Sequence, residues 1–177
     1  MPRIPLLQAS EIAPGPLVDA ILARRNGQLI ALDRLLLHSA PVAEGWNQMM
    51  GKVRQELALD PMLRELAICA VAVLNYADYE LHHHAPVYLK HGGTPAQLEV
   101  LTGLDLPEES PLFDDAQRAV LKMSRESTRG VIISDETFAA VKLALGSHRC
   151  VLELLVVIAS YNMVSRVLVG AGLNMES

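Results

Sequence analysis

The segment from Pro61 to Tyr76 constrains the fold more than any other part of this sequence. Asp60 followed by Pro61 is a typical helix start, because aspartate caps free backbone amides and proline suits the first helical position. The letters that follow, LAICAVAVL, are apolar on nearly every side of a helix. They therefore predict a helix that is buried on most of its faces and needs other elements packed around it.

Helical spacing of apolar residues continues along the rest of the chain. Turn residues such as Asn26-Gly27 and Gly92-Gly93 separate the periodic stretches. The β-branched run Val131–Ile133 is too short to predict a strand against this helical pattern. The predicted helices cover about 17–26, 29–38, 41–57, 61–76, 79–91, 94–104, 114–123, a stretch from 134, and 148–169. This pattern predicts an all-α fold of about eight helices in one domain over residues 1–177, with a Pro-rich extended arm at 1–16.

Composition and charge exclude several classes of protein. Apolar residues make up 51% of the 177 residues, which excludes wholesale disorder. The net charge is −5 and the lysines and arginines are scattered, which argues against a nucleic-acid partner. The N-terminus lacks a signal-peptide pattern, and the longest apolar run, Leu154–Ala159, is far shorter than a membrane span. We therefore expect a cytoplasmic protein without a membrane partner.

The two cysteines, Cys69 and Cys150, lie in apolar runs and form no CxxC motif. Free cysteine is among the most buried residue types, so both are expected to be buried structural thiols. A disulfide between them is disfavoured in a cytoplasmic protein.

Polar side chains that can carry chemistry concentrate between residues 65 and 91. Four of the six histidines lie in residues 82–91. Glu80 and His84 are four residues apart on one helix, so their side chains meet on one face. The short connection at 75–78 makes the preceding helix an antiparallel neighbour, which lets Glu65 approach His84. Carboxylates next to a histidine shift one another's pKa values, so this trio is a candidate acid–base cluster.

The spacing of these residues resembles a known motif, Glu-x11-Cys-x-Tyr/His-Cys-x3-His. Here Glu65 occupies the glutamate position, Tyr79 the aromatic position and His84 the histidine position, while Ala77 and Glu80 replace the two cysteines. The chain thus resembles the carboxymuconolactone decarboxylase/alkylhydroperoxidase-D-like family, in a branch without the cysteine pair. A glutamate four residues before the histidine is similar to the decarboxylase branch.

Flanking segments extend the resemblance over about residues 30–170. They are Leu63–Ile68, Gly92–Pro95, Ser110–Asp114 and Glu153–Arg166. The resemblance implies an alkylhydroperoxidase-D-like helical bundle that assembles as a homo-oligomer, either a dimer, a trimer or a hexamer.

The resemblance also implies a decarboxylase-like lyase that acts on a small carboxylated or lactone substrate. Glu80 and His84 would form the acid–base pair, with Glu65 orienting His84. Tyr79 or Tyr88 would donate to a substrate oxygen, and His83 would contact the substrate.

Neither a cofactor nor a metal ion is expected. Glu80 with His83 or His84 has helical ligand spacing, but the second Glu-x-x-His of di-iron bundles is absent from the sequence.

Simpler interpretations of the same residues stay open. Glu65 can form a structural ion pair with Arg149 or Arg166. His84 can be a core histidine that only hydrogen-bonds a carboxylate, and Glu80 can be a solvated charge on the helix surface. At least one of His82 and His83 is expected at the surface or at an interface. The whole chain can also be a non-catalytic binding or scaffold member of the family. A further alternative is a thiol-dependent peroxidase that uses Cys69 or Cys150. Dithiol chemistry, however, needs cysteines at the positions that Ala77 and Glu80 occupy.

Overall fold

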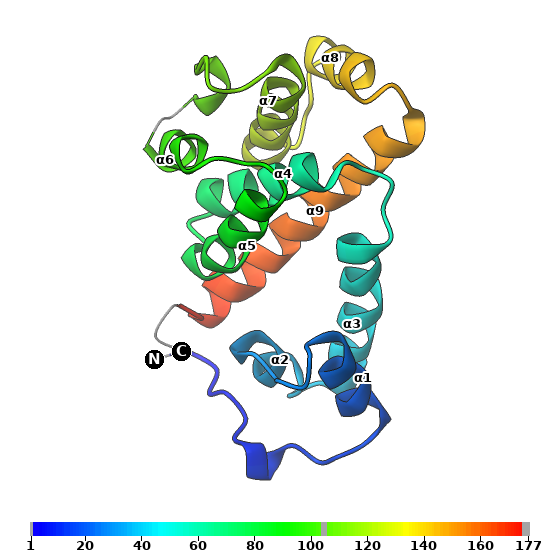
Figure 1. Cartoon of the computed structure of the whole chain (residues 1–177). Coiled ribbons are helices and arrows are strands. Elements are labelled where there is room, and N and C mark those ends of the chain that lie inside the picture. Colours follow the sequence, from blue (N-terminus) through cyan, green and yellow to red (C-terminus); the bar gives the residue numbers. More distant parts are fainter. Residues whose placement is uncertain (1, 104–105, 175–177) are drawn as a thin grey trace. The chain divides into compact units, whose positions relative to one another are not determined.

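The structure, a computed structural model, describes residues 2–103 and 106–174, and these residues form α-helices and short 3-10 helices without a strand (Figure 1). In chain order they are η1 (Ala9–Glu11), α1 (Pro16–Arg24), α2 (Ala31–Leu36), α3 (Ala40–Gln55), α4 (Pro61–Leu74), α5 (Asp78–Lys90), α6 (Pro95–Gly103), η2 (Pro107–Glu109), α7 (Asp115–Gly130), α8 (Asp135–Leu145) and α9 (His148–Ala171). The all-α prediction is confirmed, and Leu104, predicted to end a helix, lies outside the described residues.

Contacts within the chain group it into two compact units. The first comprises residues 1–57 with 168–177, and the second comprises residues 58–167. The sequence predicted a single domain over residues 1–177, and this remains a prediction.

The first unit holds α1, α2 and α3 together with the N-terminal arm. The arm is irregular except for η1, and the backbone amide of Arg3 donates to the carbonyl of Ala171 at 2.7 Å. Asp33, buried at the start of α2, forms ion pairs with Arg24 and Arg25 at 3.4 and 3.0 Å. These contacts fix the α1–α2 corner of the unit.

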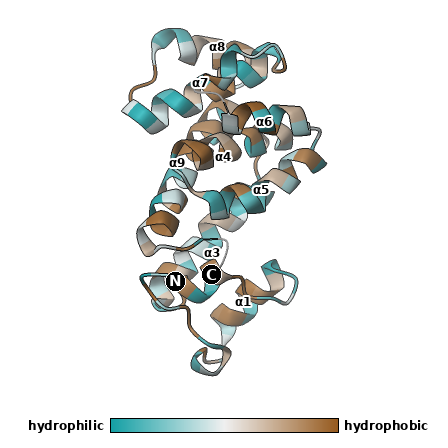
Figure 2. Ribbon diagram, turned by 90° about the vertical axis from the view of Figure 1, so that its left-hand side faces the viewer, coloured by the Kyte–Doolittle hydropathy of each residue, from teal (hydrophilic) through white to brown (hydrophobic). Residues whose placement is uncertain are grey.

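The second unit is built around α4, which packs against α5, α6 and α7. Every residue from Leu63 to Ala72 is buried, so the predicted burial of this helix on most faces is confirmed. Each fully buried Leu, Ile or Val side chain in such a core stabilises the fold by about 1.5–3 kcal/mol. In Figure 2 the largely brown ribbon of α4 lies beside a teal stretch of α5, which carries the polar residues.

Both ends of α4 are closed by local hydrogen bonds. The carboxylate of Asp60 accepts from the backbone amides of Met62 and Leu63 at 2.9 and 3.1 Å, as the sequence predicted. At the other end Tyr76 adopts a left-handed conformation (φ 56°), and the amide of Ala77 donates to the carbonyl of Ala72 at 2.9 Å. This is a Schellman-type ending with tyrosine where glycine is usual. It turns the chain tightly enough for α5 to return along α4.

The C-terminal helix α9 brings distant residues of this unit together. Asn162 in α9 accepts from the side-chain amide of Asn75 at 2.9 Å and donates to Thr128 of α7 at 2.9 Å. These contacts hold α9 against the end of α4 and against α7, and the neighbouring residue of α9, Tyr161, reaches His84 of α5.

Candidate active site

The candidate site centres on the imidazole of His84 in α5. Its Nδ1 lies 2.6 Å from Oε2 of Glu65 in α4, and its Nε2 lies 3.1 Å from Oε1 of Glu80, one turn earlier in α5. The structure therefore brings together the three residues that the sequence singled out. Each ring nitrogen of His84 faces a carboxylate from a different side.

Two further residues complete the cluster, and sequence reasoning missed both. Nε of Arg64 donates to Oε1 of Glu65 at 3.1 Å. The hydroxyl of Tyr161 in α9 lies 3.2 Å from Nε2 of His84, and the two rings meet edge to face with centroids 5.0 Å apart. A buried glutamate needs a cation, and that signal points to the adjacent Arg64. Nothing local in the sequence points to Tyr161.

The alternative partners considered for Glu65 are engaged elsewhere. Nε of Arg149 donates to Glu153 at 2.8 Å, and Arg166 donates to the backbone carbonyl and side-chain oxygen of Asn162. The cationic partners of Glu65 are instead Arg64 and His84. Predicting Arg149 or Arg166 was wrong, because each of them pairs within α9 with a residue four positions away.

The cluster lies almost completely inside the protein. Glu65, Glu80 and His84 are 2%, 3% and 8% exposed, and Tyr161 is fully buried. Interpreting Glu80 as a solvated helix charge is therefore wrong, because α5 turns that face inward.

Burial and charge act in opposite directions on these groups. Burial by itself raises the pKa of Glu65, but the hydrogen bond and charge of His84, together with Arg64, bring that pKa below its ordinary value. Burial lowers the pKa of His84, while the hydrogen bonds and charges of Glu65 and Glu80 outweigh it and raise that pKa above its ordinary value. The arrangement thus favours an imidazolium held between two carboxyl groups.

The predicted substrate-binding residues lie in different surroundings. Tyr79 is buried and stacks edge to face on His83, with ring centroids 4.5 Å apart. His82 and His83 are both exposed, which confirms that at least one of them reaches the surface. Tyr88 is buried, and its hydroxyl donates to Oε1 of Gln97 at 2.8 Å. The structure places Tyr88 in that separate polar network, not against His84.

The cysteine environments differ from each other. Cys69 is fully buried, and burial together with the charges of Glu65 and Glu80 raises the pKa of its thiol. Cys150 is only partly buried, so the prediction of two buried thiols holds for Cys69 alone. Both cysteines are free thiols.

No group of three or more His, Cys, Asp and Glu side chains in 2–103 and 106–174 is placed to hold a metal ion. One helix in these ranges, α9, is long and apolar enough to cross a membrane by length and composition, and 56% of its most apolar window is buried within the chain. The core helix of a soluble protein passes the same test.

With this geometry in place, comparison with known proteins identifies the segment that carries the site. Residues 40–122 match the model of the carboxymuconolactone decarboxylase family. This segment belongs to the carboxymuconolactone decarboxylase family. It contains Glu65, Glu80 and His84 of the cluster, whereas Tyr161 lies beyond the matched residues. The family resemblance predicted from the motif is thereby confirmed.

Solved structures show the same fold. An uncharacterized peroxidase-related protein from Silicibacter sp. TM1040 superposes with a TM-score of 0.75 and 20% sequence identity, covering 92% of this chain and 89% of that one. At this sequence identity the likeness establishes the fold alone. A search among curated proteins found no match.

Proposed function

We propose that this chain is an acid–base enzyme of the decarboxylase kind that acts on a small carboxylated or lactone substrate. The observation that carries the proposal is His84, held between Glu65 at Nδ1 and Glu80 at Nε2. Membership of residues 40–122 in the carboxymuconolactone decarboxylase family supports the reaction class.

The two carboxylates have different roles in this proposal. Glu65 is fixed by Arg64 and holds the Nδ1 side, so it orients the ring and stabilises its positive charge. Glu80 faces Nε2 and exchanges a proton with it. A histidine with one nitrogen anchored can pass protons through the other, which is the arrangement that general acid–base catalysis requires.

The proposed decarboxylation consumes only the substrate and one proton. The bond between the substrate carbon and its carboxylate breaks, carbon dioxide leaves, and the electron pair moves into the conjugated carbonyl to give an enolate. The proton on Nε2 of His84 stabilises the enolate oxygen and is then delivered to carbon, directly or through Glu80. A proton from solvent restores the imidazolium.

In this proposal the substrate approaches His84 at Nε2, because Glu65 occupies Nδ1. The single proton on that nitrogen faces both Glu80 and the Tyr161 hydroxyl, at 3.1 and 3.2 Å. A substrate oxygen that replaces Tyr161 at this nitrogen gains a charged donor, and the displaced hydroxyl is free to donate to the substrate. Tyr79 and His83, which precede His84 in α5 by five residues and by one, are proposed to contact the rest of the substrate.

A thiol-dependent mechanism is less well supported by the same residues. Peroxidase chemistry requires a thiolate, but Cys69 is buried and its pKa is raised. Ala77 and Glu80 stand where the family motif has its cysteines.

Paired variants test the proposal. Glu80→Gln and His84→Asn are expected to lower the rate of carbon dioxide release from unsaturated lactone acids by about 100-fold or more, the usual contribution of a general acid or base. Glu99→Gln and His82→Asn repeat the same chemical changes at exposed positions of α6 and α5 and are expected to keep full activity. Circular dichroism checks that each variant is folded.

The same experiment separates the enzyme from a non-catalytic family member. A wild-type chain without turnover on any lactone or carboxylic acid of a broad panel, or variants that match the wild-type rate, would overturn the proposal. Assembly as a homo-oligomer and a cytoplasmic location remain proposals that light scattering and fractionation test separately.

A further inference from the structure

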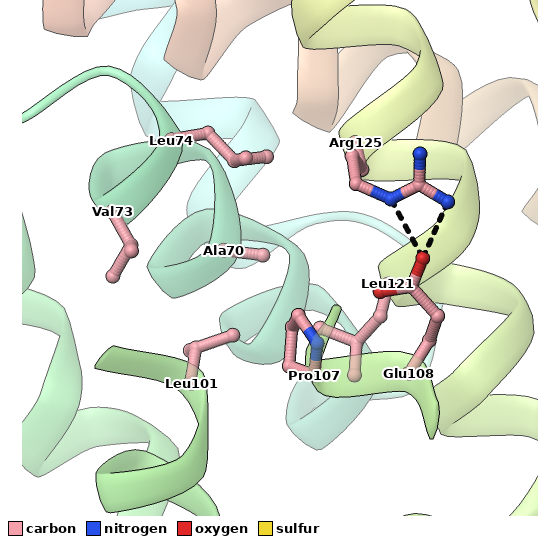
Figure 3. Close-up of a pocket in the computed structure, with 8 residues that line it drawn as sticks. All are labelled: Ala70, Val73, Leu74, Leu101, Pro107, Glu108, Leu121 and Arg125. Carbon is pink, nitrogen blue, oxygen red and sulfur yellow. Dashed lines mark hydrogen bonds and ion pairs between the residues drawn. The ribbon is translucent and has the colours of Figure 1, made fainter. Parts of the chain in front are cut away.

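A pocket large enough for a small molecule lies in the first unit, between the N-terminal arm and the helices that follow it. Its volume is about 330 Å³, within the range of roughly 300–1,000 Å³ that small-molecule sites usually occupy. The space between α4, α6 and α7 drawn in Figure 3 has about 30 Å³, which is room for water alone at roughly 10–15 Å³ a molecule. The pocket beside the arm is therefore the better candidate for a ligand.

Aliphatic side chains make up most of the pocket wall. They come from the arm, from the first turn of α1 and from the end of α2, and they include Leu7, Ile12, Leu17, Val18 and Leu37. Each of these five is only partly buried in the protein. A ligand that covers them removes apolar surface from water, which favours binding of an apolar body.

Hydrogen bonds from α2 and the turn after it hold the arm beside the pocket. Nε of Arg34 donates to the carbonyl of Leu7 at 2.6 Å, and Nε2 of His38 donates to the carbonyl of Pro5 at 2.7 Å. Figure 1 shows the arm, in blue, passing below α2 on its way to α1. The wall that Leu7 and Ile12 supply is thus formed before a ligand arrives, so binding has little additional chain to order.

The carboxylate of Glu11 gives the pocket a negative charge. Among the described residues that line the pocket, Glu11 is the charged one. Its Oε2 accepts from the backbone amide of Gln8 at 2.6 Å, and none of the described lysines and arginines forms an ion pair with it. Glu11 is exposed, so a ligand in the pocket can reach its Oε1.

The first turn of α1 adds a weaker charge of the opposite sign. Gly15, the residue before this helix, supplies no side-chain cap, so the first backbone amides of the helix carry a partial positive charge of about half a unit. The full negative charge of Glu11 exceeds this partial charge. The pocket therefore favours a cation over an anion.

We propose that this pocket binds a primary alkylammonium ion of medium chain length. The ammonium group donates to Oε1 of Glu11, and the alkyl chain packs on Leu7, Ile12 and Leu17. Such a ligand has one charged end and an aliphatic body, which matches the single carboxylate and the aliphatic wall of the pocket.

Three probes with equal numbers of non-hydrogen atoms test the assignment on the wild-type protein. In an amide chemical-shift titration at low salt, heptylammonium is expected to saturate with a Kd on the order of 1 mM, and the shifts should centre on residues 7–18 and 37–40. 1-Heptanol is expected to bind about threefold to fivefold more weakly, because an exposed ion pair contributes little. Hexanoate is expected to bind more weakly than 1-heptanol. In about 0.5 M sodium chloride, heptylammonium should bind no more tightly than 1-heptanol.

Variants locate the binding. Glu11→Gln is expected to bring heptylammonium to the affinity of 1-heptanol, whereas Glu44→Gln, the same change at an exposed position of α3, should keep the difference. Ala13→Leu and Ala40→Leu place a larger side chain in the pocket and are each expected to weaken heptylammonium at least about tenfold. Ala23→Leu makes that change at an exposed position of α1 outside the pocket and is expected to leave binding unchanged.

Any of four results would overturn the assignment. Linear shifts without saturation mean that water alone fills the pocket. Equal affinity of the wild type for heptylammonium and 1-heptanol at low salt removes the role of Glu11, and tighter binding of hexanoate makes the site one for anions. Wild-type affinity in both filling variants places the binding elsewhere. Because the titration measures no turnover and the pocket lies outside the 58–167 unit, its outcome is independent of the decarboxylase proposal.

Discussion

Nδ1 of His84 lies 2.6 Å from Oε2 of Glu65, although 19 positions separate the two residues in the sequence. The contact joins α4 to α5 across the tight turn at Tyr76, and both side chains are buried. A pair of this kind links protonation of the imidazole to the stability of the fold.

The first prediction concerns stability against pH. The pKa of folded His84 is raised above its ordinary value of 6.5, so folding favours its protonated form. This contribution is fully present below pH 6.5 and is lost as the pH rises through the folded pKa. Urea unfolding of wild type and His84→Gln between pH 5.5 and 9.5 should show a stability difference that shrinks with rising pH, by at most about 1.4 kcal/mol per pH unit.

The groups that face His84 set the sign of this effect. They are Glu65, Glu80 and Tyr161, with Arg64 behind Glu65. A stability difference that grows with pH would show that the ring is neutral in the folded protein and would contradict the geometry described here.

The second prediction concerns removal of the anchoring carboxylate. Glu65→Gln leaves Arg64 and His84 buried beside a neutral amide and is expected to destabilise the fold by about 3 kcal/mol at pH 6. Glu99→Gln, the same change on the surface of α6, is expected to stay within about 0.5 kcal/mol of wild type. Chemical denaturation measures both, and equal stabilities would mean that Glu65 contributes no net stability.

The third prediction concerns the turn between α4 and α5. Tyr76 is 76% exposed and holds a left-handed backbone conformation that disfavours side chains. Tyr76→Gly is therefore expected to be about 1 kcal/mol more stable than Tyr76→Ala, because glycine adopts this conformation without a steric penalty. Comparing the two variants cancels the loss of the ring, and a more stable alanine variant would contradict the observed backbone.

The fourth prediction concerns the thiols. Cys150 is partly exposed, whereas Cys69 is fully buried with a raised pKa. Iodoacetamide on the folded protein should give one adduct, at Cys150, by mass spectrometry. Denaturant should expose Cys69 and give a second adduct. Rapid modification of Cys69 in the native state would revive the thiol-dependent alternative.

The sequence by itself determined the helices and part of the cluster. Asp60 and Pro61 fix the start of α4 through contacts two or three residues away, and the apolar run after them demands burial. The pairing of Glu80 with His84 follows from helical spacing alone. These features are local, so composition and period are enough to predict them.

Only the tertiary structure decided which side chains complete the site and which leave it. Tyr161 reaches His84 from 77 positions away because α9 packs against this unit, and no local pattern encodes that contact. The packing of α5 in this unit turns Glu80 inward, and a contact between α5 and α6 places Tyr88 in the Gln97 network. Long-range contacts depend on how whole helix faces fit together, and that fit is a property of the folded chain, not of any segment.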